Sequence, residues 1–175
     1  MRFVNNIKKF WKNQSNQSQQ LIKDFPLLKD KNSNPLSIEY KVHLTAKEIT
    51  SSQKIIDTIV SKIIENDSTK RNYAGKSNQQ LEIYKKRVYK YESYCTQNVK
   101  LVPGKADRLD IYVTDIFLGK LPDQYTKNTL NYLQSTIVAN FAYITGGPYK
   151  VFDSKTQSLI EKTETYDISL YIQFS

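Results

Sequence analysis

The chain has 175 residues, enough for one domain of ordinary size with a tail. Its 39% hydrophobic content excludes wholesale disorder, and its formal net charge of +9 favours anionic partners: nucleic acid, an acidic protein surface or anionic lipid. The single cysteine, Cys95, excludes an intramolecular disulfide and a zinc site of several thiolates. No apolar run approaches the ~20 residues that span a bilayer, and no apolar signal core follows the basic start. We therefore expect a protein made in a reducing cytoplasm, with membrane partners disfavoured.

Residues 1–35 are predicted to form an arm that precedes the folded domain. In MRFVNNIKKFWK, apolar side chains occupy one side of a predicted amphipathic helix and lysines lie mostly on the other. The polar stretch NQSNQSQQ then reads as a linker, and Pro26 interrupts the apolar residues that follow it. Such an arm suits packing on its own domain, on a neighbouring subunit or on a membrane surface. The candidate subunit-interface residues are Phe3, Ile7, Phe10 and Trp11.

Residues 36–175 are predicted to form a single domain. Residues 38–44 alternate between apolar and polar side chains, as a half-buried strand does. A helix is expected over about 52–65, where six Ile and Val residues form a stripe. A polar loop over 66–80 and a long, Tyr-rich strand over 81–94 follow.

The second half of the domain repeats this order. Residues 109–113 alternate again, and a second helix is expected to begin near Pro122 and to end near Phe141. Its buried stripe would be Leu130, Leu133, Ile137 and Phe141. The glycine pair before Pro148 breaks the chain, and a clearly alternating strand closes it over 166–174.

The order strand–helix–strand, taken twice, predicts an α+β fold. The simplest arrangement that buries both helical stripes has two helices on one face of a four-stranded sheet, in ferredoxin-like or split βαβ order.

Catalytic residues, cofactor sites and metal sites are not expected. The one histidine, His43, occupies the polar side of its predicted strand, where a solvated histidine is typical. Asp110 and Asp115 have no companion at metal-ligand spacing, and no glycine-rich phosphate loop follows a strand. We therefore expect no enzymatic activity and no cofactor.

Basic and aromatic residues interleave between residues 70 and 91. Such a mixture suits phosphate binding and base stacking, although on a strand it is also typical of the solvent-exposed face of a sheet. Tyr84, Tyr89 and Tyr91 alternate with the cations. The candidate anion or nucleic-acid contacts are Lys70, Arg71, Lys85, Lys86, Arg87 and Lys90.

Three segments in the second half resemble a known family: RLDIYVTDIF, DQYTKNTLNYLQSTIVANF and ETYDISLYIQFS. In this order, over about residues 108–175, they resemble the tail-terminator or tail-completion proteins of tailed bacteriophages. The resemblance implies a non-enzymatic structural subunit that forms a ring of identical copies at the head–tail junction of a virion, beside neighbouring assembly subunits. The arm at 1–35 would then reach across to the adjacent copy.

Two other functions remain open from the residues alone. The first is a basic RNA-binding protein, such as a ribosomal protein (including an organellar one), that makes backbone contacts through the Lys, Arg and Tyr residues above. The second is a peripheral membrane-associated component of a complex, held by residues 1–12.

Overall fold

The computed structural model describes residues 40–69, 71–105, 108–133 and 138–174, which form a mixed α and β fold with several antiparallel sheets. The predicted arm and Lys70 lie outside these residues. The helices are α2 (Ala46–Ile49), α3 (Gln53–Asn66), α4 (Asn78–Tyr84) and α5 (Asp123–Leu133), with a 3-10 turn η2 at Asn72–Gly75. The strands are β1 (Tyr40–Thr45), β2 (Val88–Tyr89), β3 (Cys95–Thr96), β4 (Val99–Pro103), β5 (Leu109–Val113), β6 (Ile116–Lys120), β7 (Val138–Thr145), β8 (Pro148–Asp153), β9 (Ser158–Thr163) and β10 (Asp167–Phe174).

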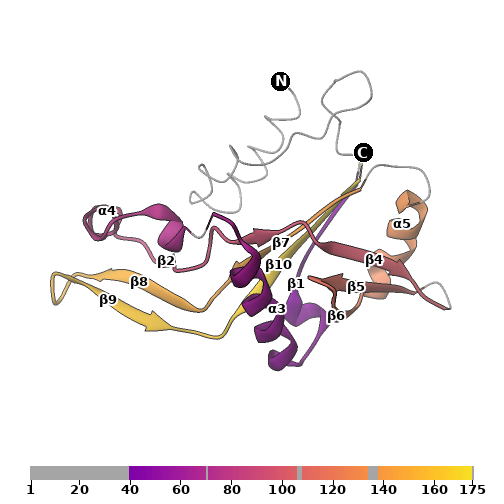
Figure 1. Ribbon diagram of the computed structural model, residues 1–175, viewed down its shortest axis with the longest axis horizontal. Coiled ribbons are helices and arrows are strands. Elements are labelled where there is room, and N and C mark those ends of the chain that lie inside the picture. Colours follow the sequence, from indigo (N-terminus) through magenta and orange to yellow (C-terminus); the bar gives the residue numbers. More distant parts are fainter. Residues whose placement is uncertain (1–39, 70, 106–107, 134–137, 175) are drawn as a thin grey trace, which may run out of the picture.

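Three sheets share these strands. The central sheet has the order β1-β10-β7-β3, and two three-stranded sheets, β2-β8-β9 and β4-β5-β6, flank it. In Figure 1 the β8–β9 hairpin extends with β2 and α4 to one end of the molecule, while β4, β5, β6 and α5 lie at the other end. Helix α3 lies against the central sheet between them (Figure 1). The molecule is therefore elongated, with a distinct surface at each end.

The main core lies between α3 and the central sheet. The predicted isoleucine stripe is confirmed, because Ile56, Ile59, Val60 and Ile63 are all buried in one cluster with the inward side chains of β1 and β10. The closing strand is confirmed as well, and its Ile168, Leu170, Ile172 and Phe174 are fully buried. The apolar face of the helix, which repeats every 3.6 residues, thus packs on the apolar face of the strands, which repeats every second residue.

The α+β class is confirmed, but the strands do not take the ferredoxin-like order. Every strand pairing is antiparallel, whereas a βαβ crossover would pair its strands in parallel. Strand β5, expected in the same four-stranded sheet as β1 and β10, instead forms a hairpin with β6 in a separate sheet. A two-residue turn at Thr114 and Asp115, both with positive φ, closes that hairpin.

The prediction of a long strand over 81–94 is wrong. Residues 78–84 form α4, and only Val88 and Tyr89 of the remainder pair as a strand, β2. The helix begins at a capping box in which Ser77 Oγ accepts from Gln80 N at 3.3 Å and Gln80 Oε1 accepts from Ser77 N at 2.8 Å. This local hydrogen bonding outweighs the strand propensity of the Tyr- and Ile-containing sequence.

The second helix is shorter than expected. Helix α5 ends at Leu133, and residues 138–145, which include Phe141, form β7 instead. Leu130 and Leu133 of the predicted stripe pack against the core but are only half-buried, as is Tyr125, whereas Ile137 lies outside the described residues. Strand β7 pairs with β10 over eight residues, from Val138↔Phe174 to Thr145↔Asp167. This long-range pairing decides the conformation of the segment, and the spacing of apolar residues within the segment does not reveal it.

Candidate nucleic-acid interface

The densest basic cluster in the sequence lies at the end of α4. Lys85 caps this helix in the left-handed conformation, at φ 53°, and its N–H donates to the carbonyl of Leu81 at 3.1 Å. The chain then turns into β2, which leaves Lys85, Lys86 and Arg87 exposed on the turn. The buried Leu81 and Val88 anchor the two elements on either side. The sequence thus holds three adjacent cations outward at a fixed bend of the backbone.

These cations belong to a larger unit, the basic lobe, which comprises residues 71–94 and 148–164. The two segments are joined through backbone hydrogen bonds: Lys90 N donates to Pro148 O at 2.7 Å, and Tyr73 N donates to Lys90 O at 2.8 Å. The lobe holds nine Lys and Arg residues against five Asp and Glu residues, a formal surplus of four. This surplus of positive charge gives the basic lobe an electrostatic attraction for anions.

Arg87 lies at the centre of one aromatic group in the basic lobe. Its guanidinium lies 4.3 Å from the ring centroid of Tyr149 and 5.9 Å from that of Tyr89. It also donates to the Tyr89 hydroxyl at 3.0 Å and to Glu164 at 3.1 Å. These contacts fix the position of the guanidinium. Arg87 therefore links Tyr89, Tyr149 and Glu164 and also adds a positive charge to the surface of the lobe.

A second group joins the 3-10 turn to the β8–β9 hairpin. The ammonium of Lys150 lies 4.7 Å from the ring centroid of Tyr73 and donates to Asn78 at 3.1 Å. The Tyr73 hydroxyl donates to Glu161 at 3.0 Å, and burial together with this carboxylate raises the pKa of Tyr73 to about 12. Tyr73 is therefore a neutral hydrogen-bond donor at physiological pH.

The remaining contacts surround the end of α4. Lys76 and Lys86 each place their ammonium 5.5 Å from the ring centroid of Tyr84, which is half-buried. Lys85 lies 5.6 Å from the ring centroid of Phe152. Cations beside partly accessible rings combine phosphate attraction with stacking surfaces, the two contributions that single-stranded nucleic acid requires.

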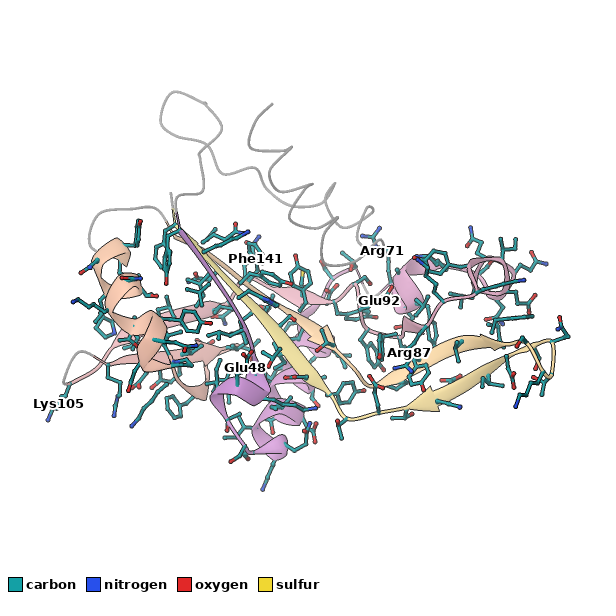
Figure 2. The ribbon with its side chains drawn as sticks, turned by 180° about the vertical axis from the view of Figure 1, so that it is seen from behind. Glu48, Arg71, Arg87, Glu92, Lys105 and Phe141 are labelled. Carbon is teal, nitrogen blue, oxygen red and sulfur yellow. The ribbon has the colours of Figure 1, made fainter. Side chains whose placement is uncertain are left out.

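The structure brings most of the predicted basic residues into this lobe. Arg71, Lys85, Lys86 and Arg87 are exposed there, and Lys90 is half-buried with its ammonium 5.3 Å from the ring centroid of Tyr91. Figure 2 shows Arg71 and Arg87 in the lobe and Lys105 at the opposite end of the molecule.

Several residues of this surface were not predicted. They are Lys150, Tyr73, Tyr149 and Phe152. The alternation of aromatic and basic residues in PYKVF (148–152) resembles that in the 84–91 segment, and this likeness could have indicated that the two segments belong to one surface. Only the pairing of β2 with β8 brings these residues beside Arg87.

His43 is not the solvated histidine that the sequence predicts. It does point away from the main core, but its ring stacks on Tyr171 with 4.5 Å between centroids and its Nε2 lies 3.4 Å from Ser169 Oγ. Burial lowers the pKa of His43, and the nearby Glu48 carboxylate partly opposes that shift. At neutral pH the ring is therefore uncharged.

Cys95 is half-buried, and burial raises the pKa of its thiol to about 11, with the Asp67 carboxylate adding to the effect. The thiol is accordingly protonated at neutral pH and a poor nucleophile. Across the described part of the chain, His, Cys, Asp and Glu side chains form no group of three or more suited to a metal ion. Among the same residues, no helix has the length and apolar character needed to cross a membrane.

Comparison with known proteins adds no relative: no family model, curated protein or solved structure matches the chain.

Proposed function

We propose that this protein is a non-enzymatic binding module whose basic lobe takes single-stranded nucleic acid. The observation that carries the proposal is the gathering of six cations over aromatic rings in one lobe, from segments about 60 residues apart in the chain. Lys85 and Lys86 are the exposed cations best placed to meet phosphates, because they lie on the turn after α4.

Tyr84 is the ring best placed to stack on a base. It lies at the end of α4, is half-buried, and has the ammonium groups of Lys76 and Lys86 close to it. A base stacked on its ring would have its own phosphates near these ammonium groups. Stacking needs unpaired bases, so this arrangement favours a single strand over a duplex.

Fluorescence anisotropy with a labelled oligothymidylate and with a labelled duplex tests the proposal. We expect the double variant Lys85→Gln, Lys86→Gln to bind the single strand more weakly and with a shallower salt dependence. For every phosphate that the variant no longer neutralises, the slope of log K against log[salt] should become shallower by about 0.7. Tyr84→Leu should weaken binding to the single strand while changing its salt slope little.

The matched control is Lys105→Gln with Lys127→Gln, which removes the same charge from exposed positions outside the basic lobe. Figure 2 places Lys105 at the opposite end of the molecule. If the control pair weakened binding as much as the Lys85 and Lys86 pair, binding would depend only on the net charge of the protein and the proposal would fail. Absence of measurable binding by the wild-type protein at low salt would also overturn it.

A second candidate function, a structural subunit that assembles with copies of itself, is favoured by a different surface. On the outer face of the β4-β5-β6 sheet, Val102 and Phe117 are more than 40% exposed, and Phe117 lies 5.4 Å from the ring of Tyr112. Exposed apolar side chains on one face of a sheet are typical of contact surfaces. A virion ring protein, which the family resemblance implies, would use such a surface between copies.

Light scattering tests this second candidate. A ring would give a defined multiple of the 20.4 kDa chain mass, and Phe117→Ser would reduce that multiple. A wild-type mass of one chain at micromolar concentration would exclude it.

A further inference from the structure

Ile83 is an apolar residue of the basic lobe that packing does not use. It lies in α4 and is 81% exposed, compared with 43% for Phe117 and 42% for Val102, the other exposed large apolar residues among those described. Leu81 anchors α4 by its buried side chain, and Ile83 lies about 200° further around the helix, on the side that faces solvent. The fold of the lobe therefore does not explain why residue 83 is apolar.

Ile83 lies on the same side of α4 as the stacking ring of Tyr84. Gln80 precedes Ile83 by three residues and Tyr84 by four, so it neighbours both on the helix surface and the three side chains form one continuous patch. The ammonium groups of Lys76 and Lys86 each lie 5.5 Å from the ring centroid of Tyr84. The patch thus combines one exposed aliphatic group, one aromatic ring and two cations.

The size of the apolar part limits what it can bind. The other residues around Ile83 on the exposed side of α4 are Gln79, Gln80 and Glu82, which are all polar. A partner helix needs a row of apolar anchors and a membrane surface needs a broad apolar face, and a single isoleucine supplies neither. It does suffice to cover one methyl group. The ligand that matches the patch is a planar ring that carries a methyl group and is attached to a phosphate.

We propose that Ile83 contacts the C5-methyl group of a thymine stacked on Tyr84, so that the basic lobe prefers single strands that contain thymine. This inference rests on the proposed function and goes beyond it by naming the base. The C5-methyl distinguishes thymine from the other DNA bases and is a known target for apolar side chains. Uracil, the corresponding base of RNA, lacks this methyl group. Ile83 would therefore favour DNA over RNA through the base, with no contact to the sugar.

Fluorescence anisotropy with two labelled DNA strands of equal length, oligothymidylate and oligodeoxyuridylate, tests the inference. The strands differ only in the methyl group, and we expect the wild-type protein to bind oligothymidylate about four-fold more tightly, the value of burying one methyl group. The two salt slopes should be equal, because both strands carry the same phosphates. Oligodeoxycytidylate should gain a similar factor when its bases are methylated at C5.

Ile83→Ser should bring the ratio of the two affinities close to one by weakening binding to oligothymidylate, with binding to oligodeoxyuridylate nearly unchanged. Because Ile83 is so exposed, this change leaves the packing of the lobe intact. Ile83→Leu keeps an aliphatic group at the same position and should retain most of the preference. The matched control is Val102→Ser, which removes an exposed aliphatic side chain from the β4-β5-β6 sheet and should leave the ratio at its wild-type value.

Equal binding of the two strands by the wild-type protein would overturn this inference and leave the proposed function standing. Absence of binding to either strand would overturn both. A preference for thymine that persisted in Ile83→Ser would place the methyl contact elsewhere and would also contradict the inference. Equal binding of the strands, with Ile83→Ser instead reducing sedimentation with phosphatidylserine vesicles, would make Ile83 a membrane contact and would equally overturn it.

Discussion

Gly146 lies against the backbone of Thr165 so closely that a β-carbon at residue 146 would sit 2.3 Å from the Thr165 carbonyl oxygen. Gly146 also has a φ of +74°, a conformation that side chains with a β-carbon rarely adopt. The sharp exit from β7 into β8, which carries the hairpin of the basic lobe, therefore depends on glycine twice: for its φ and for its lack of a side chain.

Gly146→Ala should be strongly destabilising, and Gly75→Ala is its matched control. Gly75 has nearly the same φ, +75°, but a β-carbon there would meet only the Arg71 side chain at 3.9 Å. We expect the control to cost about 1–2 kcal/mol for the left-handed conformation alone, and Gly146→Ala to cost clearly more. Urea unfolding of both variants measures the difference in unfolding free energy. Equal losses would show that the Thr165 backbone can move to make room for the added β-carbon.

Ile59→Ala should reduce the free energy of unfolding by about 2–4 kcal/mol, because Ile59 is fully buried between α3 and the central sheet. Ile64→Ala removes the same atoms from a half-buried position of the same helix. The loss of unfolding free energy should be smaller for Ile64→Ala, because truncating a half-buried side chain removes less buried apolar surface and creates a smaller cavity. The ratio of the two costs, from denaturant midpoints at a common m-value, checks that the stripe is core; a ratio of one would contradict it.

His43 should make the folded protein less stable as the pH falls from about 7.5 to 5.5. Burial lowers the pKa of His43 in the folded protein, so the unfolded chain binds the proton more readily near its ordinary value of 6.5. The stabilising contribution is therefore complete above that value and is lost as the pH falls below it. His43→Phe keeps a ring against Tyr171 and removes the titration.

The measurement is the change in unfolding free energy between these two pH values, compared between wild type and His43→Phe. Burial raises the pKa of Glu92, which acts in the opposite direction, but it does so in both proteins and cancels in the comparison. An identical change in the two proteins would mean that His43 titrates as it does in water.

Cys95 should react slowly with iodoacetamide in the native protein. With a thiol pKa of about 11, its thiolate fraction at pH 8 is roughly 200-fold below that of a thiol with the ordinary pKa of about 8.5. Unfolding in urea should restore the faster rate, and mass spectrometry can follow both reactions. A native rate within a few-fold of the unfolded rate would show that the thiol is accessible and ordinary.

The elements that could be predicted from the sequence are those whose pattern is local and repeated. The isoleucine stripe of α3 and the alternation of β10 each extend over several turns or pleats, so one periodicity dominates. The 81–94 segment could not be assigned in this way, because its Tyr and Ile residues favour a strand while the Ser77 capping box starts a helix. Residues around Phe141 fit a helical stripe, yet they form the strand that pairs with β10.

By itself, the sequence determined the α+β class, the core helix, the closing strand and a basic, aromatic segment. Only the tertiary structure decided that β7 is a strand, that the aromatic side chains of Phe141, Tyr143 and Tyr171 share one face, and that Lys150 and Tyr149 join Arg87 in one lobe. The physical reason is the same in each case. Antiparallel pairing joins residues about 30 to 60 positions apart through backbone hydrogen bonds, and side-chain patterns along a single segment do not encode which strand will be its partner.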